Sequence, residues 1–173
     1  MSAENQAQRR FYLSWIAALV VLSAAGLTET SPEPIDKVLV IKHERILQLL
    51  TRGKVVKTYK VALGAAPVGP KQRQGDHRTP EGLYILDSRN SHSQFHKSIH
   101  ISYPNQQDEA RAAAAHVAAG GDLYLHGLPN GFGRVGAAHR LRDWTDGCIA
   151  VTDNEIDEIW RLVKNGTPIE IKP

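Results

Sequence analysis

The stretch "DWTDGCIAV", Asp143–Val151, holds the single cysteine of the chain. A lone cysteine in an oxidising compartment is buried, pairs with another chain, or serves as a reactive thiol. Burial is the default for this residue type. Gly147, directly before Cys148, lets the backbone approach a substrate carbonyl, and this favours the reactive thiol. The cellular compartment and the other motifs of the chain must decide whether Cys148 is buried, paired with another chain, or reactive.

The N-terminus predicts export. Arg9-Arg10 precedes an uncharged apolar run, "FYLSWIAALVVLSAAGL", at residues 11–27. A basic start followed by such a run is typical of a signal peptide, and its length is also close to that of a membrane span. We therefore expect residues 1–27 to be a signal peptide or an N-terminal membrane anchor, with 28–37 as a linker. Either outcome places the remaining chain in the periplasm or cell envelope, and in the second outcome residues 11–27 anchor it in the inner membrane.

The length and composition predict that the remaining chain, residues 38–173, forms one domain. The full chain has 173 residues, of which 42% are hydrophobic but only 6% aromatic, so its core must be mostly aliphatic. The net charge of +3 is mildly basic. Because the sequence has no arginine-rich run with interleaved aromatic residues, we expect no nucleic-acid partner. Membrane contact is expected only through the N-terminal segment.

Alternating and periodic patterns predict a mainly β fold with flanking helices. Helix end signals appear at 108–121, and a capping box at Thr152–Glu155 starts a second helix. Residues 64–82 and 128–144 are rich in glycine and polar residues, so they are predicted to be loops. Strands are predicted at 37–43, 45–51, 54–63, 83–89, 97–104, 122–127 and 167–172, the first three as consecutive antiparallel hairpins.

His126 is the first candidate partner for Cys148. Each lies where a predicted strand or turn meets a glycine, at "LYLHG" and "TDGCI". A nucleophilic thiol needs a base within hydrogen-bond reach and donors for the oxyanion. With 8 histidines in the chain, however, spacing alone is weak evidence.

Metal binding is the competing interpretation. His92, His96 and His100 would share one face of a helix and could bind zinc. The alternation in "SIHIS" predicts a strand instead, and the chain has neither an HExxH pattern nor a second cysteine. We therefore predict no metal site.

Four linked motifs resemble one known family. "HG" at 126–127, followed by "TDGCI" at 145–149, resembles the signature of the YkuD-type L,D-transpeptidase catalytic domain, the cysteine enzymes of bacterial peptidoglycan. "GDHRTPEGLY" at 75–84 and "HKSIHISYPN" at 96–105 match two further family segments. The resemblance covers the chain from Val38 to its C-terminus. It implies a β-sandwich or barrel-like catalytic domain.

The resemblance also implies a mechanism. Cys148 would be the nucleophile, His126 its base and acid, and the carbonyl of Gly127 would orient the imidazole, while Gly147 shapes the turn beside the oxyanion. The substrate would be a peptidoglycan stem peptide, and the acyl group would pass to an amine of a second stem or of an envelope protein. No cofactor is implied.

Two departures from the family pattern leave alternatives open. Many members have histidine where this chain has Asp146, and arginine or asparagine where it has Ala150. The cation expected at 150 could be replaced by a nearby arginine, unless these arginines only form a solvated basic loop. The segment "DWTDGCIAV" also resembles a subgroup of the family in which some members cut peptidoglycan linkages. An L,D-carboxypeptidase or endopeptidase is therefore the first alternative, and a non-catalytic peptidoglycan-binding module is the second. The candidate substrate-binding residues are Thr145, Asp146, Arg134, Arg140, Arg142, His96 and Tyr84, with Thr79 as a further groove candidate.

Overall fold

A computed structural model describes residues 34–173. The predicted signal or anchor segment, and the linker up to residue 33, lie outside the described residues. Within residues 34–173 no helix combines the length and apolar character needed to span a membrane.

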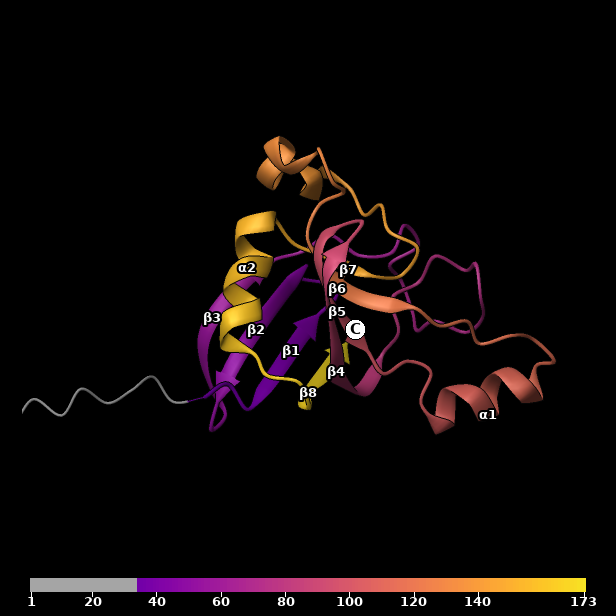
Figure 1. Cartoon of the computed structure of the whole chain (residues 1–173). Coiled ribbons are helices and arrows are strands. Elements are labelled where there is room, and N and C mark those ends of the chain that lie inside the picture. The colour runs from indigo at the N-terminus through magenta and orange to yellow at the C-terminus, as the bar shows by residue number, and fades with distance from the viewer. Residues whose placement is uncertain (1–33) are drawn as a thin grey trace, which may run out of the picture. The chain divides into compact units, whose positions relative to one another are not determined.

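The described chain begins with a three-stranded meander (Figure 1). Strands β1 (Lys37–Ile41), β2 (Ile46–Thr51) and β3 (Lys54–Lys60) pair antiparallel in sequence order. The predicted hairpins are therefore confirmed. Along β1, Val38 and Val40 are fully buried while their neighbours are half-buried, as the two-residue period of a strand requires.

Five further strands complete one eight-stranded sheet. They are β4 (Gly82–Ser93), β5 (His96–Ile101), β6 (Leu123–His126), β7 (Ile149–Ala150) and β8 (Thr167–Lys172). The order across the sheet is β3-β2-β1-β8-β4-β5-β6-β7. The last strand in sequence, β8, therefore lies in the middle, parallel to β1 and antiparallel to β4.

The two edges of this sheet meet. Ala62, just after β3, exchanges two backbone hydrogen bonds of 2.9 Å with Ala150 in β7, and Gly64 forms a second bridge to Thr145. One sheet therefore curls on itself, which is the barrel-like form of the expected fold. The mainly β class is confirmed. The bridge also places the segment after β3 against the cysteine-bearing turn.

Within residues 34–173, two α-helices flank the sheet, α1 (Gln106–Ala114) and α2 (Asp153–Leu162). The capping box of Thr152 and Glu155 is present as predicted. The first helix was predicted to run to 121, and this was wrong: it ends at Ala114. Beyond it, the carbonyls of Ala118 and Ala119 accept hydrogen bonds from the Gln74 N–H and the Tyr103 hydroxyl, and these tertiary bonds replace helical ones.

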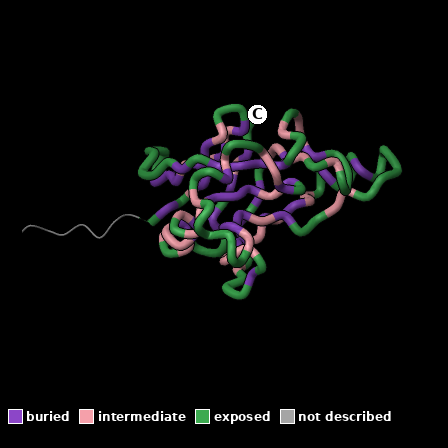
Figure 2. Tube along the Cα trace, turned by 90° about the horizontal axis from the view of Figure 1, so that it is seen from above, coloured by how far each residue is buried: buried purple, intermediate pink, exposed green. Residues whose placement is uncertain are grey.

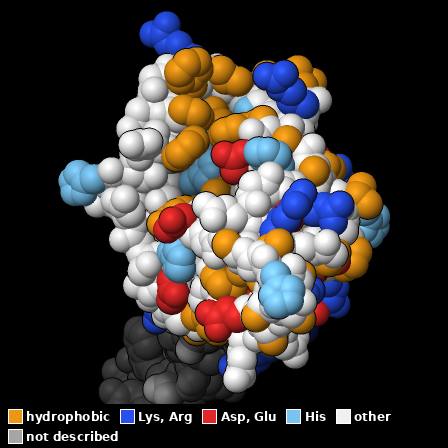
Figure 3. Space-filling view, turned by 90° about the vertical axis from the view of Figure 1, so that its right-hand side faces the viewer, with side chains coloured by type: hydrophobic (Ala, Val, Ile, Leu, Met, Phe, Trp, Pro, Cys, Tyr) orange, Lys and Arg blue, Asp and Glu red, His pale blue; other side chains and the backbone are white. Residues whose placement is uncertain are grey.

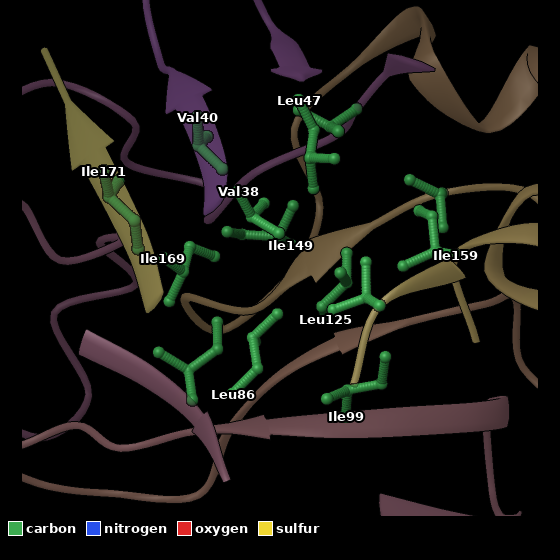
Figure 4. Close-up of a cluster of buried hydrophobic side chains, with 14 of the residues drawn as sticks. Val38, Val40, Leu47, Leu86, Ile99, Leu125, Ile149, Ile159, Ile169 and Ile171 are labelled. Carbon is green, nitrogen blue, oxygen red and sulfur yellow. The ribbon is translucent and has the colours of Figure 1, made fainter. Parts of the chain in front are cut away.

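Between β6 and β7, residues Gly133–Leu141 form short 3₁₀ turns within a segment predicted to be a loop. The buried residues form the interior of the curled sheet, with exposed loops around them (Figure 2). Ile156 and Ile159 of α2 are fully buried against this core. Figure 4 shows Ile159 of α2 beside Leu125 of β6, so the helix packs against the strand that carries His126.

Candidate active site

The strand register explains how residues 22 positions apart come to share one site. Leu125 of β6 pairs with Ile149 of β7, and both are fully buried in the core. Because side chains alternate along a strand, the flanking residues Tyr124, His126 and Cys148 face the other side of the sheet. All three line one cavity of about 590 Å³.

This cavity is lined by polar and aromatic residues. A space-filling view shows hydrophobic, acidic and histidine side chains gathered around a hollow in the surface (Figure 3). The cavity is lined by Asn90, His92, Ser93, Gln94, Phe95, Ser98, Asp122, Tyr124, His126, Trp144, Thr145, Asp146 and Cys148. Among residues 34–173, no lysine or arginine contributes to this lining.

His126 is fixed in one tautomer. Its Nδ1 lies 2.7 Å from the carbonyl oxygen of Gly127, which can only accept, so Nδ1 carries the hydrogen and Nε2 is left as the acceptor. The rings of Phe95 and Trp144 hold the imidazole, with centroids at 4.5 and 5.9 Å. Burial lowers the pKa of His126 to about 4, against the opposing effect of the Gly127 carbonyl. The imidazole is therefore neutral at pH 7.

Gly127 occupies a place where a side chain would clash. A Cβ there would lie 2.8 Å from a carboxylate oxygen of Asp153 and 3.0 Å from Ile156. Asp153 also accepts a hydrogen bond of 2.8 Å from the Leu128 N–H. The start of α2 therefore packs against the backbone that carries the orienting carbonyl.

Cys148 is half-buried at the edge of the cavity, and its thiol is 3.8 Å from the carbonyl oxygen of Asp122. Burial raises the pKa of this thiol, and the carboxylates of Asp146 and Asp122 raise it further, whereas a backbone hydrogen bond from Tyr124 and the charge of Lys71 oppose the rise. The thiol is therefore protonated at neutral pH. The Cys148 thiol and the His126 imidazole are therefore both uncharged at pH 7.

Thr145 holds the turn before the cysteine. Its hydroxyl donates to the Cys148 carbonyl at 2.7 Å and accepts from the Gly147 N–H at 3.1 Å. Gly147 has φ of 124°, and a Cβ there would lie 2.6 Å from the Arg78 carbonyl oxygen, so only glycine fits. The Gly147 N–H is therefore occupied by the Thr145 hydroxyl.

The start of the "DWTDGCIAV" stretch is fixed by Asp143. Its carboxylate accepts the Leu63 N–H at 2.9 Å and pairs with Arg45 at 2.9 Å. The Trp144 and Thr145 N–H groups both lie 3.1 Å from the Leu63 carbonyl. The segment after β3 therefore fixes the cysteine-bearing turn in place.

Two predicted substrate contacts lie away from this cavity. The side chain of His96 is 3.0 Å from Asp157 of α2. Tyr84 is buried and donates to Asp108 at 2.9 Å. Thr79, the further groove candidate, is also buried and accepts the Gly64 N–H at 3.0 Å. These contacts link His96 to α2, Tyr84 to α1 and Thr79 to the start of the 64–82 loop. A substrate role for these three residues stays a prediction.

The three candidate arginines also lie off the cavity. Arg140 forms an ion pair with Glu155 of α2. Arg142 lines a neighbouring apolar cavity on the other side of Trp144, and Arg134 is exposed on the 3₁₀ segment. Ala150, where related enzymes place a cation, is completely buried and pairs with both Ala62 and His126. None of these three arginines lines the cavity that Cys148 shares with His126.

The sequence patterns did not predict some of the residues that line the cavity. Phe95, Trp144, Tyr124 and Asp122 line the cavity, and the first two hold the His126 ring. Trp144 could have been found, because it lies within the quoted cysteine stretch. Phe95 could not, because its place beside His126 depends on the pairing of β5 with β6.

Histidines do not gather into a metal site in the described part of the chain. Residues 34–173 contain no group of three or more His, Cys, Asp or Glu side chains that could hold a metal ion. His92 lies on β4, and His96 and His100 lie on β5, so the helical spacing considered for zinc does not occur.

Comparison with known proteins gives the same family at several levels. The family model for the YkuD L,D-transpeptidase catalytic domain matches residues 36–171. The curated protein "Putative L,D-transpeptidase YafK" of Escherichia coli K12 is 33% identical over 164 residues, covering 82% of this chain and 58% of that protein. The chain therefore spans less than two thirds of this relative.

Solved structures give the same fold. Bd1075 of Bdellovibrio bacteriovorus has a TM-score of 0.58 at 26% identity and covers 83% of this chain and 49% of that chain. Pgp2 of Campylobacter jejuni has a TM-score of 0.61 at 23% identity, with 82% and 49% covered. With the family model matching most of its length, the chain belongs to the YkuD family of L,D-transpeptidase catalytic domains.

Proposed function

We propose that this protein is a cell-envelope L,D-transpeptidase that acts on peptidoglycan stem peptides through an acyl-enzyme on Cys148. The observation that carries the proposal is the placement of the Cys148 thiol and the oriented, neutral imidazole of His126 on one face of the sheet and at one cavity. Export of this domain follows from the apolar segment at residues 11–27 and is part of the same proposal.

The first half-reaction forms a thioester. Sγ of Cys148 attacks the carbonyl of the third stem residue as His126 Nε2 takes the thiol proton, because neither group is charged beforehand. The Cys148 N–H stabilises the oxyanion. When the C–N bond breaks, His126 returns the proton to the leaving amine of the terminal D-amino acid. The residues need no cofactor for these steps.

The second half-reaction decides between transferase and hydrolase. An amine of a second stem or an envelope protein gives a cross-link or an attachment, and water gives a trimmed stem. One observation favours the hydrolase alternative: among the described residues, the cavity shared by Cys148 and His126 has no lysine or arginine to hold a substrate carboxylate. Asp122 and Asp146 border it instead.

The relatives support the general chemistry. The 33% identical Escherichia coli protein carries the name of an L,D-transpeptidase. The Campylobacter protein is described as a helical cell shape determining protein, and that description applies to that protein. Because cross-linking or trimming of stems changes the cell wall, an influence on cell shape belongs to our proposal for this chain.

Incubation of the full chain with muropeptides, followed by mass spectrometry of the products, tests this function. Dimers or amine adducts support the transferase, and shortened stems without dimers support the hydrolase. Cys148→Ala should abolish both kinds of product. If this variant retained every activity and phenotype of the unaltered chain, the non-catalytic binding module would replace both proposals.

A further inference from the structure

Cys148 borders two cavities. Besides the larger cavity with His126, it lines a second one of about 380 Å³. Asp122, Asp146 and Cys148 are common to both, so they form the boundary between the two spaces. His126 lies on the larger cavity only, and His77 lies on the smaller one only. A nucleophile could therefore reach an acyl group on sulfur from the side opposite to the bound stem.

The loop that carries His77 is firmly held. Asp76 accepts hydrogen bonds from the Lys71 ammonium at 2.8 Å and from the backbone N–H groups of Gln72 and Arg78 at 2.7 and 3.1 Å. The Ala66 N–H donates to the His77 carbonyl at 3.0 Å. The loop therefore forms a fixed wall beside the cysteine turn.

The backbone of His77 itself is constrained. Its φ of 53° lies in the left-handed region, which a residue with a side chain adopts only where its surroundings require it. A Cβ on Gly64 would lie 2.3 Å from the His77 carbonyl oxygen, which shows how closely the two backbones pass. Packing therefore fixes the direction from which the imidazole leaves the chain.

The His77 imidazole is paired with Asp146, which lies two positions before Cys148 in the sequence. His77 Nδ1 lies 2.7 Å from a carboxylate oxygen of Asp146. The acceptor fixes the hydrogen on Nδ1, so Nε2 is the nitrogen that can take a proton. A carboxylate that orients an imidazole in this way is the usual arrangement of a general base.

Two other histidines form the same kind of pair with an aspartate away from the cysteine. His96 pairs with Asp157, but Lys97 shares that carboxylate. His100 pairs with Asp87 at the same 2.7 Å as His77 with Asp146, yet it lines neither cavity. Only the His77–Asp146 pair, among the His–Asp pairs of residues 34–173, lies on a cavity with the nucleophile.

We propose that His77, oriented by Asp146, is the general base of the second half-reaction and serves the nucleophile that enters through the smaller cavity. This inference rests on the proposed acyl-enzyme function. As the amine or water forms its bond to the thioester carbonyl, its N–H or O–H proton passes to His77 Nε2. The C–S bond then breaks, and the proton on His77 returns through solvent to the Cys148 sulfur. The resting thiol and imidazole are restored.

The test measures acylation and deacylation separately in the variant His77→Asn. Asparagine tolerates the left-handed conformation, and its side-chain NH₂ can still donate to Asp146, so the variant removes the base while preserving the loop. The full-length unaltered chain and the variant are mixed with a tetrapeptide stem, and the acyl adduct is followed by intact-protein mass spectrometry. We expect acylation to change less than about twofold and deacylation to slow by about 100-fold, the usual contribution of a positioned base.

Two controls make the result specific. His100→Asn removes the histidine of the matched pair on the sheet and should deacylate at the unaltered rate. Hydroxylamine, which is a strong nucleophile without prior deprotonation at neutral pH, should restore deacylation of His77→Asn. Equal thermal unfolding midpoints of the variants establish that they are folded.

The outcomes are distinguishable. Deacylation of His77→Asn within about twofold of the unaltered rate overturns the role of His77, as does slow deacylation that hydroxylamine does not restore, because a blocked cavity would then be the cause. If the unaltered chain forms neither adduct nor product, the proposed function fails, and the inference about His77 fails with it.

Discussion

The two histidines that flank the cysteine site differ in nearly every physical respect. His126 is buried between two aromatic rings and bound to a backbone carbonyl, whereas the side chain of His77 is 54% exposed and bound to a carboxylate. Burial lowers the pKa of His126 to about 4 and keeps it neutral. A histidine base can therefore be kept ready either by desolvation, which suits proton transfer from a neutral thiol, or by a partner carboxylate, which suits a nucleophile that arrives from solvent.

The largest expected effect is on acylation. His126→Gln removes the proton acceptor for a thiol whose pKa is raised by burial, so adduct formation should fall about 10²–10⁴-fold. Rapid-quench mass spectrometry measures this rate. His77→Asn, on the other cavity, should acylate normally under the same conditions. Unchanged acylation in His126→Gln would refute the assignment of the base.

The buried imidazole should also make stability depend on pH. The pKa of His126 is lowered from 6.5 to about 4, so the unfolded chain binds a proton before the native chain does. Stability is thus fully present above pH 6.5 and is lost as the pH falls to 4, by about 3 kcal/mol. Urea unfolding of the unaltered chain and of His126→Gln across this range measures the difference. Parallel profiles would contradict the buried, neutral imidazole.

Local patterns in the sequence predict elements but not the contacts between them. The strands and the Thr152–Glu155 cap were predicted because they depend on alternation and on residues three positions apart. The resemblance to a family pointed to Cys148 and His126. Neither shows that Ala62 bridges Ala150, or that His77 approaches Asp146, because these contacts join residues far apart in sequence through loops without a period.

The same limit applies to the arginines. Their sequence position beside the cysteine stretch suggested a carboxylate site, but Arg140 is held by Glu155 and Arg142 faces a different cavity. The end of α1 was misplaced for a related reason. The alanine run favours a helix locally, yet hydrogen bonds from Gln74 and Tyr103 end it.

A smaller effect is expected in the loop that carries His77. Burial alone would raise the pKa of Asp76, but hydrogen bonds from Lys71 and three backbone N–H groups lower it to about 2. The stabilisation is present above pH 3.8 and is lost as the pH falls to 2, so Asp76→Asn should cost about 2 kcal/mol at neutral pH. Chemical denaturation checks this value. A loss below about 0.5 kcal/mol would mean that the loop is held by other contacts.

The smallest effects are expected at the exposed arginines. Arg134→Ala and Arg142→Ala should change kcat/KM by less than about fivefold, because exposed charges contribute about 0.2–1 kcal/mol. Steady-state assays with muropeptides measure this, with His126→Gln as the inactive reference. A tenfold or larger fall in either variant would return that arginine to the substrate site.

Detection of an acyl adduct on Cys148 is the most direct test of the proposed acyl-enzyme. The full chain is mixed with a tetrapeptide stem, quenched with acid, and mapped by tandem mass spectrometry of the peptide that contains residues 143–151. We expect a tripeptide acyl group on Cys148 that forms in the unaltered chain and is absent from Cys148→Ala. Turnover of the stem without this adduct, or equal turnover by Cys148→Ala, would contradict it.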